Sequence, residues 1–152
     1  MGSAFTYLLK VRYYECDAQQ VVFNARYGDY FDTASTEFFR AVFGDYKQLL
    51  ARGLDCQLVK QTTQWQSSAR FDDVLAISVT ASRVGTTSFT LNFSVLNYAT
   101  RMGIAECETV YVMVDAKSFT KTAVPEDVRE QLLTGAPDTV TNHAGVQLNV
   151  EP

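Results

Sequence analysis

Histidine and cysteine are both scarce in this sequence. It has one histidine, His143, and three cysteines, Cys16, Cys56 and Cys107. Any Cys-His, Ser-His-Asp or multi-histidine metal scheme would therefore have to use His143, which lies in a polar stretch near the chain end where we expect it to be exposed. The cysteines are widely spaced and odd in number, which favours reduced thiols, as in a cytoplasm, over disulfides or a zinc site.

Long apolar runs and nucleotide-binding motifs are also missing. No run approaches the ~20 apolar residues of a membrane span, and no secretory signal precedes the chain's first strand-like segment. The patterns G-x-x-x-x-G-K-[ST], G-x-G-x-x-G, G-x-S-x-G and H-E-x-x-H do not occur. With 13 Lys+Arg against 17 Asp+Glu, the net charge of -4 has the wrong sign for binding nucleic acid. We predict a cytoplasmic protein with no membrane span, nucleic-acid partner, metal or organic cofactor.

What is present suits one globular domain. The 152 residues are 47% hydrophobic, which is enough for a real core without metals or disulfides. After Gly135-Ala136-Pro137 the composition turns polar. We therefore predict a domain over residues 1–135 and a loose polar C-terminal tail over 136–152.

The periodicity changes twice along the chain. Residues 5–14 alternate between apolar and polar side chains, as a half-buried strand requires. From Tyr27 onward a three-and-four spacing predicts a helix that ends at Gly44, followed by a short helix over 45–52. The apolar stripe of the long helix is unusually aromatic and consists of Tyr27, Tyr30, Phe31, Ala34, Phe38, Phe39 and Val42.

After Gly53 the pattern predicts one long or two short strands over 54–68, with Trp65 in the core. Clean alternation then predicts strands over 75–82, 89–95 and 105–114. Pro125 begins a short helix with acidic residues in its first turn. The order is strand, long aromatic helix, then four or so antiparallel strands without helices between them. An α+β domain follows, in which the sheet buries its apolar face on a single helix.

One segment concentrates the polar chemistry, because carboxylates lie on a loop just before the long helix. Asn24 is a favoured N-cap residue for that helix. Unpaired N–H groups at a helix start can stabilise an oxyanion, and a nearby carboxylate such as Asp17 can act as nucleophile or general base. Asp17 could also simply cap a turn, and Cys16 has no neighbouring histidine to make it a catalytic thiol.

The segment resembles the active-site region of the acyl-CoA thioesterases of the 4-hydroxybenzoyl-CoA thioesterase family, including the branch associated with the Tol-Pal system. The likeness spans roughly residues 9–114. The motifs that carry it are Arg12-Tyr13, Cys16-Asp17-Ala18, Val21-Val22-Phe23, Asn24-Ala25-Arg26-Tyr27, Phe31-Asp32-Thr33-Ala34-Ser35 and Ala69-Arg70-Phe71-Asp72-Asp73.

The resemblance implies the hotdog fold, an antiparallel sheet wrapped around one long central helix, and hydrolysis of an acyl-CoA thioester to a carboxylic acid and free CoA. It implies that Asp17 is the catalytic carboxylate and that the backbone N–H of Asn24 is the leading oxyanion donor. Tyr27 would shape the acyl pocket, or serve only as a core aromatic residue. Members of the family form homodimers, often paired into homotetramers, so we expect an oligomer here.

Two departures from the family pattern leave alternatives open. Gln20 stands where glycine is frequent, which could demand a different loop conformation, and Asn24 stands where the Tol-Pal branch has histidine. A non-catalytic protein that binds acyl-CoA or an acyl carrier is the main alternative, while a dehydratase of this fold would need a histidine near Asp17. Arg70 and Arg83 are the candidates for binding the CoA phosphates, although each could be an ordinary surface charge.

Overall fold

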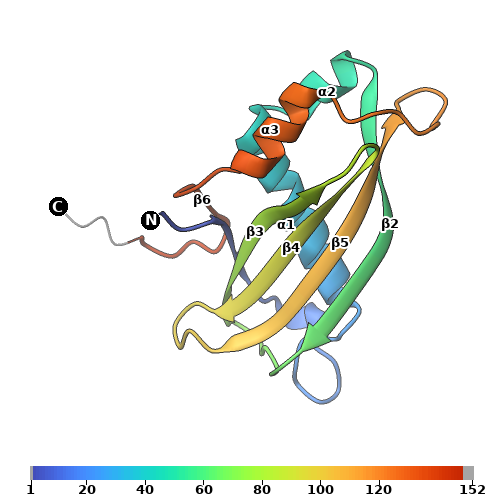
Figure 1. The fold of residues 1–152 in the computed structure, drawn as a ribbon. Coiled ribbons are helices and arrows are strands. Elements are labelled where there is room, and N and C mark those ends of the chain that lie inside the picture. Colours follow the sequence, from blue (N-terminus) through green and yellow to red (C-terminus); the bar gives the residue numbers. More distant parts are fainter. Residues whose placement is uncertain (1, 149–152) are drawn as a thin grey trace.

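A computed structural model describes residues 2–148 of the chain (Figure 1). Six strands and three α-helices follow one another, with one short 3₁₀ helix after the first strand. In chain order they are β1 (Phe5–Lys10), η1 (Tyr13–Glu15), α1 (Arg26–Phe43), α2 (Lys47–Ala51), β2 (Leu54–Trp65), β3 (Val74–Val84), β4 (Ser88–Asn97), β5 (Gly103–Asp115), α3 (Glu126–Thr134) and β6 (Val140–Asn142). No helix within this range combines the length and apolar character needed to cross a membrane.

The strands form one sheet in the order β2-β5-β4-β3-β1-β6. Every neighbouring pair is antiparallel except β1 and β6, which run parallel. The predicted strand over 54–68 is the single strand β2, with an irregularity in its pairing to β5 between Leu58 and Lys60. The sheet curves around α1, as predicted for a hotdog fold (Figure 1).

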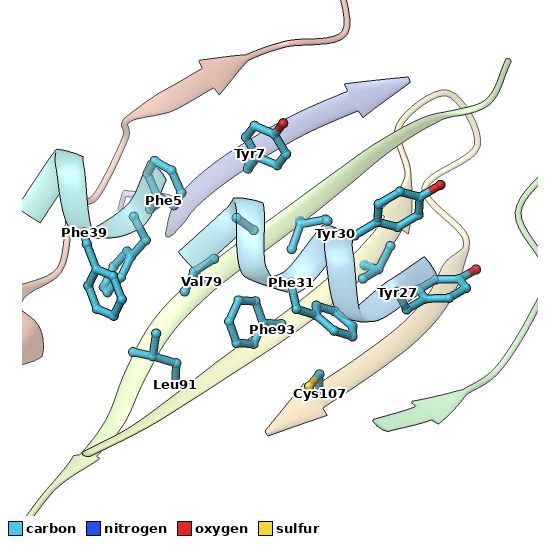
Figure 2. Close-up of a cluster of buried hydrophobic side chains, with 14 of the residues drawn as sticks. Phe5, Tyr7, Tyr27, Tyr30, Phe31, Phe39, Val79, Leu91, Phe93 and Cys107 are labelled. Atoms are coloured by element: carbon cyan, nitrogen blue, oxygen red, sulfur yellow. The ribbon is translucent and has the colours of Figure 1, made fainter. Parts of the chain in front are cut away.

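The core lies between the inner face of the sheet and α1. The predicted aromatic stripe is confirmed, because its residues are buried except Val42, which is partly buried. Phe31 meets Phe93 of β4 with ring centroids 5.2 Å apart (Figure 2). Phe38 meets Phe5 of β1 at 5.8 Å. The helix ends at Gly44 as predicted, where φ is 81°.

The two ends of the sheet carry different segments. The helices α2 and α3 lie at one end, and the loop between β1 and α1 lies at the other (Figure 1). That loop is tied to the connection between β2 and β3, since Val22 N–H donates to Ala69 O at 2.8 Å and Val11 N–H donates to Asp73 O at 2.9 Å. These bonds bring residues near 20 and near 70 together.

The prediction of a loose polar tail is wrong for the described part of residues 136–152. Thr6 N–H donates to Thr139 O at 3.0 Å, β6 pairs with β1, and His143 N–H donates to Leu8 O at 2.9 Å. Backbone hydrogen bonds to an open sheet edge hold this segment, and they need no apolar alternation in the sequence. Residues 149–152 of the predicted tail lie outside the described residues.

Candidate functional site

Asp17 lies in a tight loop that crosses the end of the sheet. Its N–H donates to Val21 O, and its C=O accepts from Gln20 N–H, both at 2.9 Å. Gln20 has φ of 67°, the left-handed conformation that glycine adopts most easily. The loop therefore combines close backbone hydrogen bonds with a strained non-glycine residue.

The Asp17 carboxylate is partly buried and only half engaged. Oδ1 accepts the Gln19 N–H at 2.8 Å, so Asp17 does cap a turn, as one interpretation of the sequence expects. Its other oxygen makes no hydrogen bond to any residue from 2 to 148. One carboxylate oxygen is therefore held in place and the second is open to a substrate or a water molecule.

The start of α1 differs from the predicted cap. Ala25, one residue after Asn24, is the N-cap, and the side chain of Asn24 makes no capping hydrogen bond. The turn before the helix is closed by Arg26 N–H, which donates to Phe23 O at 2.9 Å. The Phe23 N–H is taken by Glu15 O at 2.9 Å. Within the described chain the N–H groups of Asn24 and Ala25 have no acceptor. Two donors at the positive end of the helix are thus available.

A cavity of about 550 Å³, here called the helix-start cavity, brings Asp17, Asn24 and Tyr27 together. It contains no Lys or Arg side chain, and its remaining lining residues are Gln19, Val21, Val22, Phe23, Trp65, Gln66, Ser67 and Ser68. Asp17 and the helix start therefore border one space, as the sequence interpretation requires.

Tyr27 lies in the core at the start of α1 and its predicted role in shaping the acyl pocket stays a prediction. It is 2% exposed within the core and also lines the helix-start cavity. Burial raises the pKa of Tyr27 to about 12, so its phenol is protonated at neutral pH and cannot act as a base. Figure 2 shows its hydroxyl pointing away from the apolar cluster.

The prediction that Trp65 belongs to the core is wrong. Trp65 is 47% exposed, because it ends the edge strand β2, and its ring meets that of Tyr27 edge to face at 5.7 Å. It forms part of the helix-start cavity. The alternation of β2 does not indicate that Trp65 is exposed, since a residue at the last position of an edge strand lacks neighbours on one side.

Asp17 also borders a second cavity of about 420 Å³, here called the arginine cavity, which it shares with Arg70. Its other lining residues are Tyr13, Cys16, Gln20 and Phe71. Arg83, the other predicted phosphate ligand, is not brought near Asp17 within one chain. It lies nine residues beyond Val74 on β3, about 30 Å along the strand.

A buried tyrosine braces the Asp17 loop against α1. Tyr30, which is 4% exposed, donates its hydroxyl to Glu15 Oε1 at 3.1 Å, and Arg12 N–H donates to the same oxygen at 2.7 Å. Burial, followed by the Glu15 carboxylate, raises the pKa of Tyr30 far above its usual range, so the hydroxyl stays a donor. Glu15 thus links the helix to the turn two residues before Asp17.

His143 is exposed as predicted, and it borders neither of the two cavities that Asp17 lines. Its Nδ1 lies 3.0 Å from the hydroxyl of Tyr7 on β1. Among residues 2–148, no group of three or more His, Cys, Asp or Glu side chains is placed to hold a metal ion. The chemical groups at the site are therefore a carboxylate, backbone amides and an arginine.

A sheet wrapped around one helix, with a carboxylate and free amides at the helix start, defines a hotdog-fold protein with a site suited to acyl chemistry. Residues 11–132 match the Thioesterase-like superfamily, and the chain belongs to that family, as predicted from its motifs. The segment that carries β6 and His143 lies beyond the matched residues.

Individual relatives agree with this assignment. The chain is 27% identical over 124 residues to the acyl-CoA thioester hydrolase YbgC of Escherichia coli O157:H7. The aligned residues cover 82% of this chain and 92% of that protein. It is 26% identical to the hypothetical protein AQ1494 of Aquifex aeolicus, whose crystal structure matches with a TM-score of 0.76 over 84% of this chain and 98% of that one. The 1,4-dihydroxy-2-naphthoyl-CoA thioesterase Slr0204 of Synechocystis, 16% identical with a TM-score of 0.75 over 86% of this chain and 96% of that one, shares the fold.

Proposed function

We propose that this protein hydrolyses an acyl-CoA thioester to a carboxylic acid and free CoA, with Asp17 as the catalytic carboxylate. One observation carries the proposal: Asp17, with its half-engaged carboxylate, and Asn24, with its unpaired N–H at the start of α1, border the same cavity. The family match supports hydrolase chemistry, and the similarity to the acyl-CoA thioester hydrolase YbgC supports acyl-CoA as the substrate. A cytoplasmic location remains a prediction from the free cysteines.

The proposed reaction needs only these groups. As a general base, Asp17 takes a proton from water, and the resulting hydroxide adds to the thioester carbonyl carbon. The backbone N–H of Asn24, with that of Ala25, stabilises the oxyanion. Collapse of the intermediate breaks the C–S bond, and the proton passes from Asp17 to the departing thiolate.

Asp17 could instead attack the carbonyl carbon itself. That route forms an acyl-aspartyl anhydride with loss of the thiolate, and water then hydrolyses the anhydride. Label found in Asp17 after a single turnover in ¹⁸O-labelled water identifies the anhydride route, because only attack of water on the aspartyl carbon of the anhydride puts it there. Both routes use the same oxyanion donors.

The test is replacement of Asp17 by Asn and by Ala, with thiol release followed on a panel of acyl-CoAs. We expect a loss of about 10²–10⁴-fold in kcat on the best substrate. Asp45→Asn is a matched control, because Asp45 Oδ1 accepts Lys47 N–H at 3.0 Å in the same kind of turn beyond the other end of α1. Turnover by Asp17→Asn equal to that of Asp45→Asn would refute the assignment.

A non-catalytic acyl-CoA-binding protein is the second candidate, because Asn24 replaces the histidine that the resemblance leads one to expect. It predicts binding of acyl-CoA by the wild-type protein without thiol release from any substrate in the panel. Isothermal titration with the same acyl-CoAs distinguishes the two functions. The acyl chain length and its aromatic or aliphatic character are read from the same panel. The best acyl group carried on an acyl carrier protein then distinguishes CoA from carrier protein as the thiol part.

We also propose that the protein is a homodimer or homotetramer with β2 at a subunit contact. In the described chain β2 pairs only with β5, so its other edge of 12 residues is open. Leu58, Val59 and Trp65 on this strand are 50%, 58% and 47% exposed. Open apolar edges of this length favour pairing with another chain. Light scattering at micromolar concentration tests the proposal, and a monomer there contradicts it.

A further inference from the structure

We propose that the arginine cavity binds the nucleotide end of the thiol part of the substrate, with an adenine ring against the Tyr13–Phe71 pair and a phosphate on Arg70. The proposal rests on the proposed thioester hydrolysis and assigns a direction to the substrate. The acyl group lies in the helix-start cavity, the carbonyl lies beside Asp17, and CoA extends toward Arg70.

The first observation is the contrast between the two cavities that meet at Asp17. The helix-start cavity is lined by Asn24, whose N–H is free, and by Val21, Val22 and Phe23, and it has no cation among its lining residues. The arginine cavity has a guanidinium group and aromatic rings. In a chain with a net charge of -4, phosphates need a local cation. Of the two cavities, only the arginine cavity supplies one.

The second observation is an exposed pair of aromatic rings. Tyr13 of η1 is 80% exposed and Phe71, in the turn between β2 and β3, is 54% exposed. Their rings meet edge to face with centroids 5.7 Å apart. This contact leaves ring surface open to the solvent. A planar base stacks on such a surface, and this interaction tolerates an open and wet site.

The third observation is that Arg70 is free to bind an anion. Its backbone N–H donates to Asp73 Oδ2 at 2.9 Å, which fixes the turn. Its guanidinium group has no ion pair or hydrogen bond to any residue from 2 to 148, whereas nearby Lys10 pairs with Asp72 at 3.8 Å. A free guanidinium presents a planar set of donors that matches two phosphate oxygens.

The experiment compares two thioesters of one acyl group: the acyl-CoA, and the acyl-N-acetylcysteamine thioester, which lacks the nucleotide. In Arg70→Ala and Tyr13→Ala we expect KM for acyl-CoA to rise about tenfold with kcat unchanged. Both constants for the short thioester should stay at the wild-type values. Arg40→Ala and Phe119→Ala remove an exposed arginine and an exposed phenyl ring elsewhere on the surface, and serve as matched controls.

Three outcomes overturn the proposal. The first is a KM for acyl-CoA that is unchanged in the two variants, and the second is a KM that rises equally for both thioesters. The third is a changed oligomeric state of Tyr13→Ala by light scattering, which would make the rings a subunit contact. If the wild-type protein hydrolyses neither thioester, the proposed function fails on its own. Calorimetry with adenosine 3′,5′-bisphosphate then still decides the binding site: binding that Arg70→Ala weakens supports it, and no binding by the wild type refutes it.

Discussion

The two ends of α1 use similar residue types in opposite ways. Beyond the C-terminal end, Tyr46 donates its hydroxyl to Asp55 Oδ1 at 2.5 Å and accepts the Cys56 N–H at 3.1 Å. Before the N-terminal end, Asp17 keeps one carboxylate oxygen open and Asn24 keeps a free N–H. An aspartate and aromatic rings are present at both ends, but only at the C-terminal end is the aspartate hydrogen-bonded to an aromatic hydroxyl.

The aromatic residues show the same contrast. Phe39, which is 5% exposed, meets five rings with centroids 5.7 to 6.1 Å away, those of Phe38, Phe43, Tyr46, Phe89 and Tyr111. At the other end Tyr13, Phe23, Trp65 and Phe71 are between 47% and 80% exposed. The C-terminal end of α1 therefore stabilises the fold, while the N-terminal end leaves groups available to a ligand.

The largest expected effect is on stability at the C-terminal end. Phe39→Ala should lower the free energy of unfolding by about 3–5 kcal/mol, because it removes a buried ring and leaves a cavity among its neighbours. Phe23→Ala, at the N-terminal end, should change it by less than about 0.5 kcal/mol, since Phe23 is 49% exposed. Urea unfolding of both variants measures the difference, and equal losses would contradict the comparison.

A smaller effect is expected on turnover at the N-terminal end. Tyr30→Phe removes the hydrogen bond to Glu15 while the ring stays packed, so the Asp17 loop loses its brace to the helix. We expect kcat to fall about tenfold with KM nearly unchanged, and the free energy of unfolding to fall by about 1 kcal/mol. Tyr30 is thus predicted to be a positioning residue.

Tyr7→Phe is the matched control for this prediction. It also removes one tyrosine hydroxyl with one partner, but Tyr7 lies on β1 and its partner, His143 Nδ1, lies just after β6. It should cost similar stability and leave kcat at the wild-type value. A similar fall of kcat in both variants would show a general loosening of the fold in place of a role for Glu15.

Most of the fold could be predicted because its elements carry strong periodic patterns. The stripe of α1 and the alternation of β3 and β4 are signalled by residues that are buried on one face. The β6 segment could not be predicted, because its backbone pairs with β1 and its side chains show no apolar pattern. The alternation over residues 5–14 also overran the strand: β1 ends at Lys10, and η1 turns Tyr13 outward.

The candidate site was predictable where it is local in sequence. Asp17, Asn24 and Tyr27 lie within 11 residues and meet in one cavity, because the loop and the first helical turn are contiguous. Trp65 and Tyr13 needed the tertiary structure. Their places depend on where β2 and β1 end and on the bond between Val22 and Ala69, and no periodic signal in the sequence encodes these.

The smallest expected effect tests whether the active loop stores strain. Gln20 holds φ at 67°, which is unfavourable for a side chain with a Cβ and free of cost for glycine. Gln20→Gly should therefore raise the free energy of unfolding by about 0.5–1 kcal/mol, after allowing for the greater freedom of glycine in the unfolded chain. Urea unfolding at neutral pH measures this change.

The neighbouring residue provides the control. Gln19 is also exposed, and it is not among the residues with positive φ, so Gln19→Gly gains no relief of strain and should lower the free energy of unfolding by about 0.5–1 kcal/mol. Its N–H to Asp17 Oδ1 survives the change, because glycine keeps the backbone donor. Opposite signs for two adjacent Gln→Gly changes would locate the strain at Gln20. A change of the same sign in the free energy of unfolding of both variants would mean that the loop holds Asp17 without strain at Gln20.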